Sequence, residues 1–231
     1  MARARSEAPA HAPRRCASDP GRDCPRCPRL VAFRNEWRGK EPGWFNAPVP
    51  SFGPVDARLL IVGLAPGLQG ANRTGRPFTG DYAGVLLYET LGDFDFAKGT
   101  FGARIDDGLT LTDCRITNAV RCVPPENKPT PAEITACRDF LIPAITEMKN
   151  LRAIVALGAI AHQSVLSAFA AKKSAMPFKH GGKYMLSMAN ANAIAFFSSY
   201  HCSRYNTNTG VLTPKMFRDV FKAVRGFLDG A

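Results

Sequence analysis

The chain has 231 residues, of which 45% are hydrophobic and 21% are charged, which suits one medium-sized domain and is too short for two large ones. It contains no run of about 20 apolar residues, which excludes an ordinary membrane-spanning helix. Its formal net charge of +11 favours a polyanionic partner, of which nucleic acid is the simplest.

Residues 1–22 are basic and rich in Pro and Ala, and they lack the apolar middle of a secretory signal. We expect them to form a mobile tail ahead of a domain that covers 23–231. Seven cysteines without a secretory signal indicate a reducing, cytoplasmic compartment, where cysteines serve as metal ligands, reactive thiols or core residues. No feature indicates an oligomer, so we expect a monomer.

Four apolar runs rich in β-forming residues alternate with helix-like segments. The predicted strands are Arg58–Leu64, Cys114–Val120, Ala153–Leu157 and Ala193–Tyr200, and the predicted helices are Leu30–Trp37, Ala83–Leu91, Pro131–Lys149, Ala159–Phe169 and Pro214–Leu228. Thr130 and Thr213 each precede a proline, which is a helix start signal. Buried strands that alternate with helices predict an α/β fold, a three-layer α/β/α sandwich with a central four-stranded parallel sheet.

Ligands of such folds bind beyond the carboxyl ends of the strands, and the first of those ends carries the segment GLAPGLQGANRTGRPFTGD at 63–81. Its glycines let the backbone come close to a flat or anionic group. Asn72, Arg73 and Arg76 add polar groups, and a purely structural loop is the alternative. No Gly-Lys-Ser/Thr follows the glycines, which argues against a nucleoside triphosphate site and a nucleotide-dependent enzyme.

Cysteines form the second candidate site. Four of them make two pairs, Cys24 with Cys27 and Cys122 with Cys137. Four thiolates at irregular spacing suit an iron–sulfur cluster or a structural zinc, and unliganded thiols are the alternative. Cys114 lies in a predicted strand and is expected in the core, whereas Cys16 lies in the predicted tail.

The third candidate is SYHCSRYNTNTG at 199–210. His201 follows the fourth predicted strand, where a ligand site is expected, and a structural histidine is the alternative. The loop from Ser203 to Thr209 adds polar and basic groups.

Together these segments resemble a uracil-DNA glycosylase of family 5 (type B). The resemblance is carried by GLAPG at 63–67, ANRTGRPFTGD at 71–81, NAVRCVPPENKPTP at 118–131, SYHCSRYNTNTGVLTP at 199–214 and the cysteine pair of CPRCPRLVAFR at 24–34. It spans nearly the whole chain beyond the tail. It implies a structural 4Fe–4S cluster, whose ligands by position would be Cys24, Cys27, Cys122 and Cys137.

The resemblance also implies an enzyme that flips a nucleotide out of DNA, hydrolyses its glycosidic bond and leaves an abasic site for base excision repair. We expect it to be monofunctional, because no lysine or N-terminal amine is evidently placed for Schiff-base chemistry. Its substrates would be uracil and deaminated purines such as hypoxanthine, in nucleoid DNA. The alternative is a non-catalytic iron–sulfur module that binds damaged or single-stranded DNA. Turnover on a uracil-containing oligonucleotide separates the two.

The resemblance assigns roles by position. Asp81 would stabilise the cationic sugar and orient a water, Asn118 would bind the edge of the base, and His201 would donate to the carbonyl oxygen that gains charge. Phe78 would stack on the base. Further contacts to the base would come from Gly63, Leu64, Ala65 and Gly67, and contacts to DNA from Asn72, Arg73, Arg76, Ser203, Arg204, Tyr205 and Asn206.

Two features depart from related patterns. The family's last motif usually reads His-Pro-Ser, while this chain has Cys202 after His201, so the loop loses the rigidity of a proline. Related families carry an acid inside the first loop, where Leu64–Gln69 has none. Asp81 is the nearest carboxylate, and because it precedes a predicted helix it is also a candidate N-cap. Arg204 and Tyr205 are candidates for the wedge that replaces the flipped base.

Overall fold

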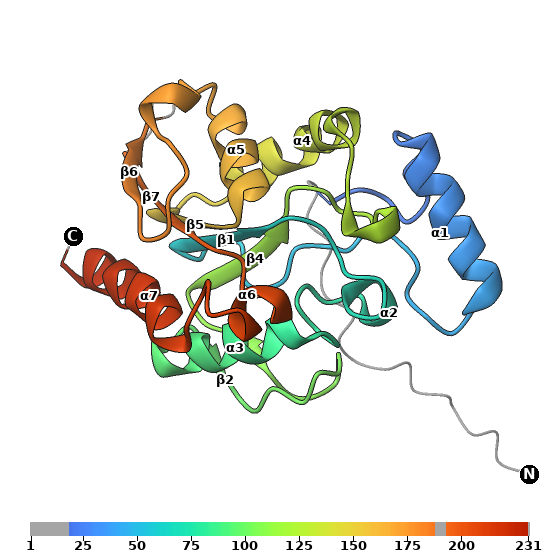
Figure 1. The fold of residues 1–231 in the computed structure, drawn as a ribbon, viewed down its shortest axis with the longest axis horizontal. Coiled ribbons are helices and arrows are strands. Elements are labelled where there is room, and N and C mark those ends of the chain that lie inside the picture. The colour runs from blue at the N-terminus through green and yellow to red at the C-terminus, as the bar shows by residue number, and fades with distance from the viewer. Residues whose placement is uncertain (1–18, 188–192, 231) are drawn as a thin grey trace, which may run out of the picture.

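The computed structural model describes residues 19–187 and 193–230. A five-stranded sheet lies between two helical layers (Figure 1). In spatial order its strands are β4 (Cys114–Asn118), β1 (Leu59–Gly63), β5 (Ala153–Leu157), β7 (Ile194–Ser199) and β6 (Lys183–Leu186). The first four are parallel, and β6 pairs antiparallel with β7. The predicted three-layer sandwich is confirmed, with one antiparallel edge strand added.

Two helices cover each face of the sheet. Figure 1 shows α4 (Pro131–Thr146) and α5 (Ala159–Ala168) on one side, and α3 (Tyr82–Asp93) and α7 (Pro214–Asp229) on the other. Because successive side chains of a strand point to opposite faces, Leu59 and Ile61 of β1 pack toward α3 and α7, while Leu60 and Val62 pack toward α4 and α5. This double burial is why the strands are continuous apolar runs.

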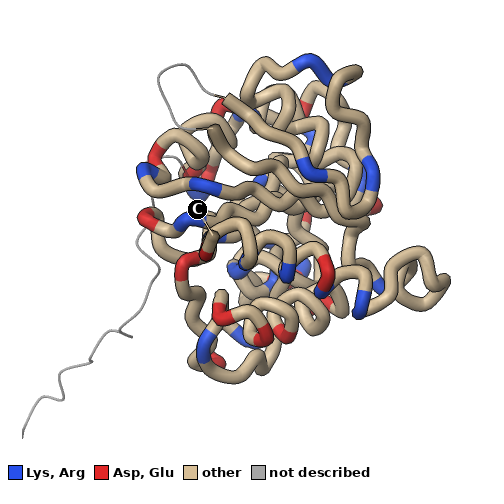
Figure 2. Tube along the Cα trace, turned by 90° about the vertical axis from the view of Figure 1, so that its left-hand side faces the viewer, with Lys and Arg blue, Asp and Glu red and all other residues tan. Residues whose placement is uncertain are grey.

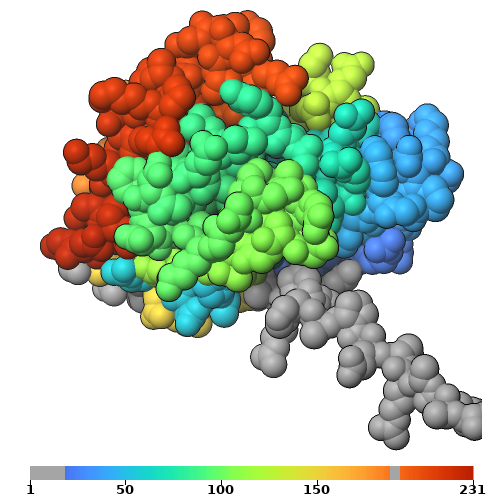
Figure 3. Space-filling view, turned by 90° about the horizontal axis from the view of Figure 1, so that it is seen from below, coloured from blue at the N-terminus to red at the C-terminus, as the bar shows by residue number. Residues whose placement is uncertain are grey.

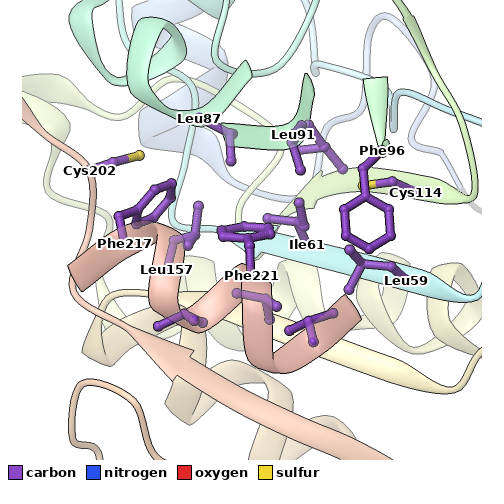
Figure 4. Close-up of a cluster of buried hydrophobic side chains, with 14 of the residues drawn as sticks. Leu59, Ile61, Leu87, Leu91, Phe96, Cys114, Leu157, Cys202, Phe217 and Phe221 are labelled. Carbon is purple, nitrogen blue, oxygen red and sulfur yellow. The ribbon is translucent and has the colours of Figure 1, made fainter. Parts of the chain in front are cut away.

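The core between α3 and α7 is drawn in Figure 4. Phe217 and Phe221 of α7 face Leu87 and Leu91 of α3 across Ile61. Cys114 is buried in the same cluster, which confirms its prediction as a core residue. Cys202 is also fully buried there.

The remaining elements of the described chain are α1 (Pro28–Lys40), α2 (Ala71–Thr74), α6 (Arg204–Asn208), the two-stranded ribbon β2 (Ala97–Lys98) and β3 (Thr110–Leu111), and 3-10 turns at Pro125–Asn127 and Lys173–Ala175. In Figure 3 the green segment that contains α3 and this ribbon covers the lower face, between α7 and α1. No helix in residues 19–187 or 193–230 is long and apolar enough to cross a membrane.

The predicted helix starts are confirmed by their caps. Thr130 accepts a hydrogen bond from the backbone N–H of Glu133, whose side chain accepts one from the Thr130 N–H. Thr213 accepts from the N–H of Met216. Each cap satisfies N–H groups that the first turn of a helix leaves without partners.

Contacts with the domain begin before the predicted boundary at residue 23. The Asp19 side chain is 2% exposed, and its Oδ1 accepts hydrogen bonds from Arg121 Nη1 at 2.8 Å and Ser51 Oγ at 3.1 Å. Residues 1–18 of the predicted tail, Cys16 among them, lie outside the described residues.

Figure 2 shows basic and acidic positions interspersed along the trace.

Candidate active site

The carboxyl ends of the strands border a cavity of about 550 Å³. Residues that follow β1, β4 and β7 meet there, as expected for an open parallel sheet. The lining includes most of the residues predicted for the base and its chemistry, namely Leu64, Ala65, Gly67, Phe78, Asp81, Asn118 and His201, and also Ser203 and Arg204. The structure therefore brings together three loops that are far apart in the sequence.

Gly63 lies beneath this cavity, at the end of β1, where it is the register partner of Asn118 on β4. A Cβ atom at position 63 would lie 2.4 Å from Asn118 Oδ1 and 2.8 Å from Phe78 Cζ. Both distances are shorter than any van der Waals contact. Glycine is therefore required here so that the amide and the ring can share one side of the cavity.

The Asn118 side chain is a buried polar group whose acceptor is unused. Asn118 is 3% exposed, and its Oδ1 has no hydrogen-bond partner among the described residues. A buried acceptor without a donor costs free energy. This position therefore suits a ligand that presents an N–H donor.

Asp81 is both a helix cap and part of the cavity wall. Its Oδ1 accepts from the Gly84 N–H at 3.3 Å at the start of α3, while its Oδ2 faces the first loop. A Cβ atom on Gly70 would lie 2.5 Å from Oδ2, and one on Gly67 would lie 3.1 Å from it. Burial raises the pKa of the Asp81 carboxyl, and hydrogen bonds from the N–H groups of Gly84 and Ala83 oppose the rise only in part.

His201 stands beside Phe78 at the end of β7. The two rings are stacked with centroids 6.0 Å apart. Burial lowers the pKa of His201 to about 4, so the imidazole is neutral at neutral pH and carries one N–H donor. The backbone of this loop is fixed by Asn206, whose Nδ2 donates to the His201 carbonyl at 2.8 Å.

The Cys202 side chain restrains this loop by packing in the core, at the position where the family motif has a proline. Its buried side chain lies in the core beside Phe217 (Figure 4), and its Sγ donates to the carbonyl of Ala83 in α3 at 3.4 Å. The His201 loop is thereby anchored to the helix that Asp81 begins. Ser203 caps the following helix, α6, by accepting from the Asn206 N–H.

Five of the predicted DNA contacts fall into two groups. Arg73, Arg204 and Tyr205 are exposed, and Tyr205 has 74% of its surface exposed. Asn72 and Arg76 are instead buried. Asn72 donates to Asn46 at 2.9 Å, and Arg76 pairs with Asp107 at 2.6 Å. Their side chains face the protein, so the structure gives them a role in holding the loop in place of the predicted contact with DNA.

Tyr82 and Asn127 also line the cavity and were not predicted as site residues. Tyr82 follows Asp81, and the Arg204 guanidinium lies over its ring, 5.3 Å from the centroid. Its position next to Asp81 was a usable signal. Asn127 reaches the cavity from the loop after β4, where Glu126 and Asn127 both have left-handed backbones with φ of 54° and 58°. No sequence pattern indicated Asn127.

The four predicted cysteine ligands line a second cavity, between α1, α4 and the segment after β4. Burial raises the pKa of Cys122 to about 12 and that of Cys137 to about 11. The backbone N–H of Arg121 donates to Cys137 Sγ at 3.2 Å. No three His, Cys, Asp or Glu side chains in the described ranges are placed to hold a metal ion. The chemistry of the four sulfurs that line this cavity, and not their present spacing, matches the thiolate ligands of an iron–sulfur cluster.

Comparisons with known proteins agree with this geometry. Residues 50–225 match the model of the uracil DNA glycosylase superfamily. The chain is 45% identical to the type-5 uracil-DNA glycosylase of Thermus thermophilus, over 85% of this chain and 90% of that protein. It is 37% identical to that of Pyrobaculum aerophilum, over 87% of both chains, and 40% identical to that of Mycobacterium bovis, over 87% and 77%. The chain therefore belongs to the uracil DNA glycosylase superfamily of DNA N-glycosylases, and within it to the type-5 family.

Proposed function

We propose that this protein is a monofunctional DNA glycosylase that excises uracil and deaminated purines such as hypoxanthine from DNA and leaves an abasic site for base excision repair. The observation that carries the proposal is the convergence of Asp81, Asn118 and His201 on one cavity. Its volume falls in the range of about 300–1,000 Å³ that is usual for small-molecule sites. The protein would act as a monomer on nucleoid DNA in the cytoplasm.

Base recognition would use the free Asn118 acceptor. The N3–H of uracil is a donor, and so is the N1–H of hypoxanthine, so the Oδ1 of Asn118 can accept from either once the nucleotide is flipped out of the helix. Phe78 would stack on the base. Ala65, Gly67 and Gly70 present little or no side chain to the cavity, which leaves room for a purine and supports the broader substrate range.

The chemistry would divide between Asp81 and His201. As the glycosidic bond breaks, the sugar gains positive charge and the base leaves with negative charge. The Asp81 carboxylate would stabilise the sugar and orient the attacking water. Neutral His201 would donate its N–H to the base oxygen, where the negative charge develops. Water then adds to C1′, and its proton is released.

The lining also supports a monofunctional enzyme. No lysine is among the residues that border the described cavity, so none of these residues offers an amine to form a Schiff base with the sugar. The strand would therefore stay intact after the base is released. Arg73, Ser203, Arg204, Tyr205 and Asn206 would contact DNA around the cavity.

Cys24, Cys27, Cys122 and Cys137 would hold a structural 4Fe–4S cluster. When bound, the cluster supplies cross-links between distant parts of the chain. Cys24 and Cys27 precede α1, while Cys122 follows β4 and leads into the loop that carries Asn127. These residues would fix that loop beside the active-site cavity.

The proposed function is tested with labelled duplexes that carry uracil, hypoxanthine or only normal bases. Strand breaks should appear on the two lesion duplexes only after alkali, because alkali cleaves abasic sites. Breaks without alkali would contradict the monofunctional assignment. Binding without base release from either lesion would overturn the enzyme in favour of a non-catalytic DNA-binding module.

Replacing Asn118 with alanine should lower kcat/KM on uracil about 10- to 100-fold, because a hydrogen bond worth about 1–3 kcal/mol is lost from a buried site. Single-turnover excision measures the loss. Binding to an abasic duplex, which lacks the base, should change little. Equal losses on the uracil and abasic duplexes would show that Asn118 acts only through the fold.

A further inference from the structure

Arg34 of α1 lies in the cysteine cavity, with only 3% of its surface exposed. Its Nη1 is 3.9 Å from Cys122 Sγ, and its Nη2 donates to the carbonyl of Cys24 at 3.2 Å. Its buried Nε has no hydrogen-bond partner among the described residues. The guanidinium is therefore directed at two of the four cysteines and is incompletely satisfied.

Neighbouring arginines differ from Arg34 in having carboxylate partners. The pairs are Arg26 with Asp139, Arg29 with Glu133, Arg38 with Asp23 and Arg121 with Asp19. In residues 19–187 and 193–230, Arg34 has no ion-pair partner. Asp23 is largely exposed and pairs with Arg38; it feels the charge of Arg34 without forming an ion pair with it.

A buried cation without an anion is costly. Arginine stays protonated inside proteins, and a buried charge is retained only where it is paired or coordinated. Protonated thiols supply no charge, whereas a 4Fe–4S cluster on four thiolates carries net negative charge. The cavity therefore contains a cation whose counter-charge would arrive with the cluster.

We propose that Arg34 is the counter-charge of the iron–sulfur cluster, and that it both retains the cluster and raises its reduction potential. This inference rests on the proposed cofactor. Reduction adds negative charge to the cluster, so a nearby cation and N–H donors to the sulfurs stabilise the reduced form. By binding the Cys24 carbonyl, Arg34 also positions the loop between the first two cysteines.

The test replaces Arg34 with methionine, which fills similar space without charge, and with lysine, which keeps the charge. The matched control is Arg29→Met, on the same helix, because Arg29 pairs with Glu133 and does not line the cavity. All proteins are reconstituted anaerobically with iron and sulfide. Iron and sulfide content, the rate of bleaching by a chelator and the midpoint potential are then measured on the loaded proteins.

Arg34→Met should lose its cluster roughly 10- to 100-fold faster than the wild type, the range seen when outer partners of metal ligands are removed. Its potential should shift to more negative values. Arg34→Lys should keep most of the potential, and Arg29→Met, which leaves the Glu133 carboxylate unpaired, should shift the potential less than Arg34→Met does. If Arg34→Met takes up no cluster, Arg34→Lys and Arg34→Gln provide the same comparison between a charged and an uncharged side chain.

An unchanged potential in both uncharged variants, Arg34→Met and Arg34→Gln, would overturn the proposal, as would an equal shift in Arg34→Lys. A wild-type protein that takes up neither iron nor sulfide would overturn the cofactor and this inference together. That result would not test the glycosylase assignment, which depends on the duplex assay.

Discussion

Replacing Asp81 with asparagine is expected to lower the rate of base excision by roughly 10²- to 10⁴-fold, the range over which a positioned acid or base contributes. Asparagine keeps the shape of the side chain and caps helices as well as aspartate does. It removes the negative charge that would face the sugar cation. Single-turnover excision on the uracil duplex measures the rate, and thermal unfolding checks the fold.

The stability of this variant follows from the sign of the pKa shift. The pKa of Asp81 is raised in the folded protein, so the folded state holds this proton more tightly than the unfolded state does. The contribution of Asp81 to stability is therefore lost as pH rises through the folded pKa. Removing the charge should leave stability at neutral pH unchanged or higher.

Asp81→Ala provides the matched control, since it removes both the charge and the cap. It should show the same loss of rate together with a stability loss of about 1 kcal/mol. Near-normal excision by Asp81→Asn would show that Asp81 serves only as a cap. In the wild type, activity should fall on the acid side at a higher pH than an ordinary aspartate would give, because protonation removes the active carboxylate.

Replacing His201 with alanine should lower the excision rate roughly 10²- to 10³-fold, as the loss of one donor to a developing oxyanion does. His201→Gln should recover part of the rate, because its amide retains an N–H donor. Since the pKa of His201 is about 4, the ring does not titrate near neutral pH. The ratio of wild-type to alanine rates should therefore stay constant across that range.

Pre-steady-state excision over a pH series gives this ratio. A loss that grew as pH fell through neutrality would indicate that a protonated imidazolium is the donor, contrary to the expectation. Binding to an abasic duplex serves as the control for loop damage, because His201 also stacks on Phe78.

The sequence predicted the central sheet well because strands buried on both faces leave long apolar runs. The prediction for Ala153–Leu157 matches β5 at both ends. Strand β6 was missed because KYML is a short, largely exposed edge strand with one buried residue, so it has no such run. The glycines in the loop after β1 and the ends of the predicted strands likewise indicated where the cavity lies.

Which way a polar side chain faces could not be predicted. Asn72 and Arg76 lie in a glycine-rich loop whose sequence looks the same whether they meet DNA or the protein. Their partners, Asn46 and Asp107, are 26 and 31 positions away, and only the folded chain brings them together. The burial of Arg34 could not be predicted either, because nothing in the sequence of its helix indicates it.

The space around Asp81 Oδ2 has a consequence for how this family can change. Cβ atoms at 67 and 70 would lie within 3.1 Å and 2.5 Å of that oxygen, so a carboxylate borne by either position would compete with Asp81 for one place. A carboxylate at 70 would therefore clash with Asp81, and one at 67 would crowd it, so neither can be added while Asp81 keeps its present place. Moving the carboxylate from the start of α3 to the first loop would require substitutions in both segments. We therefore expect positions 67, 70 and 81 to change together.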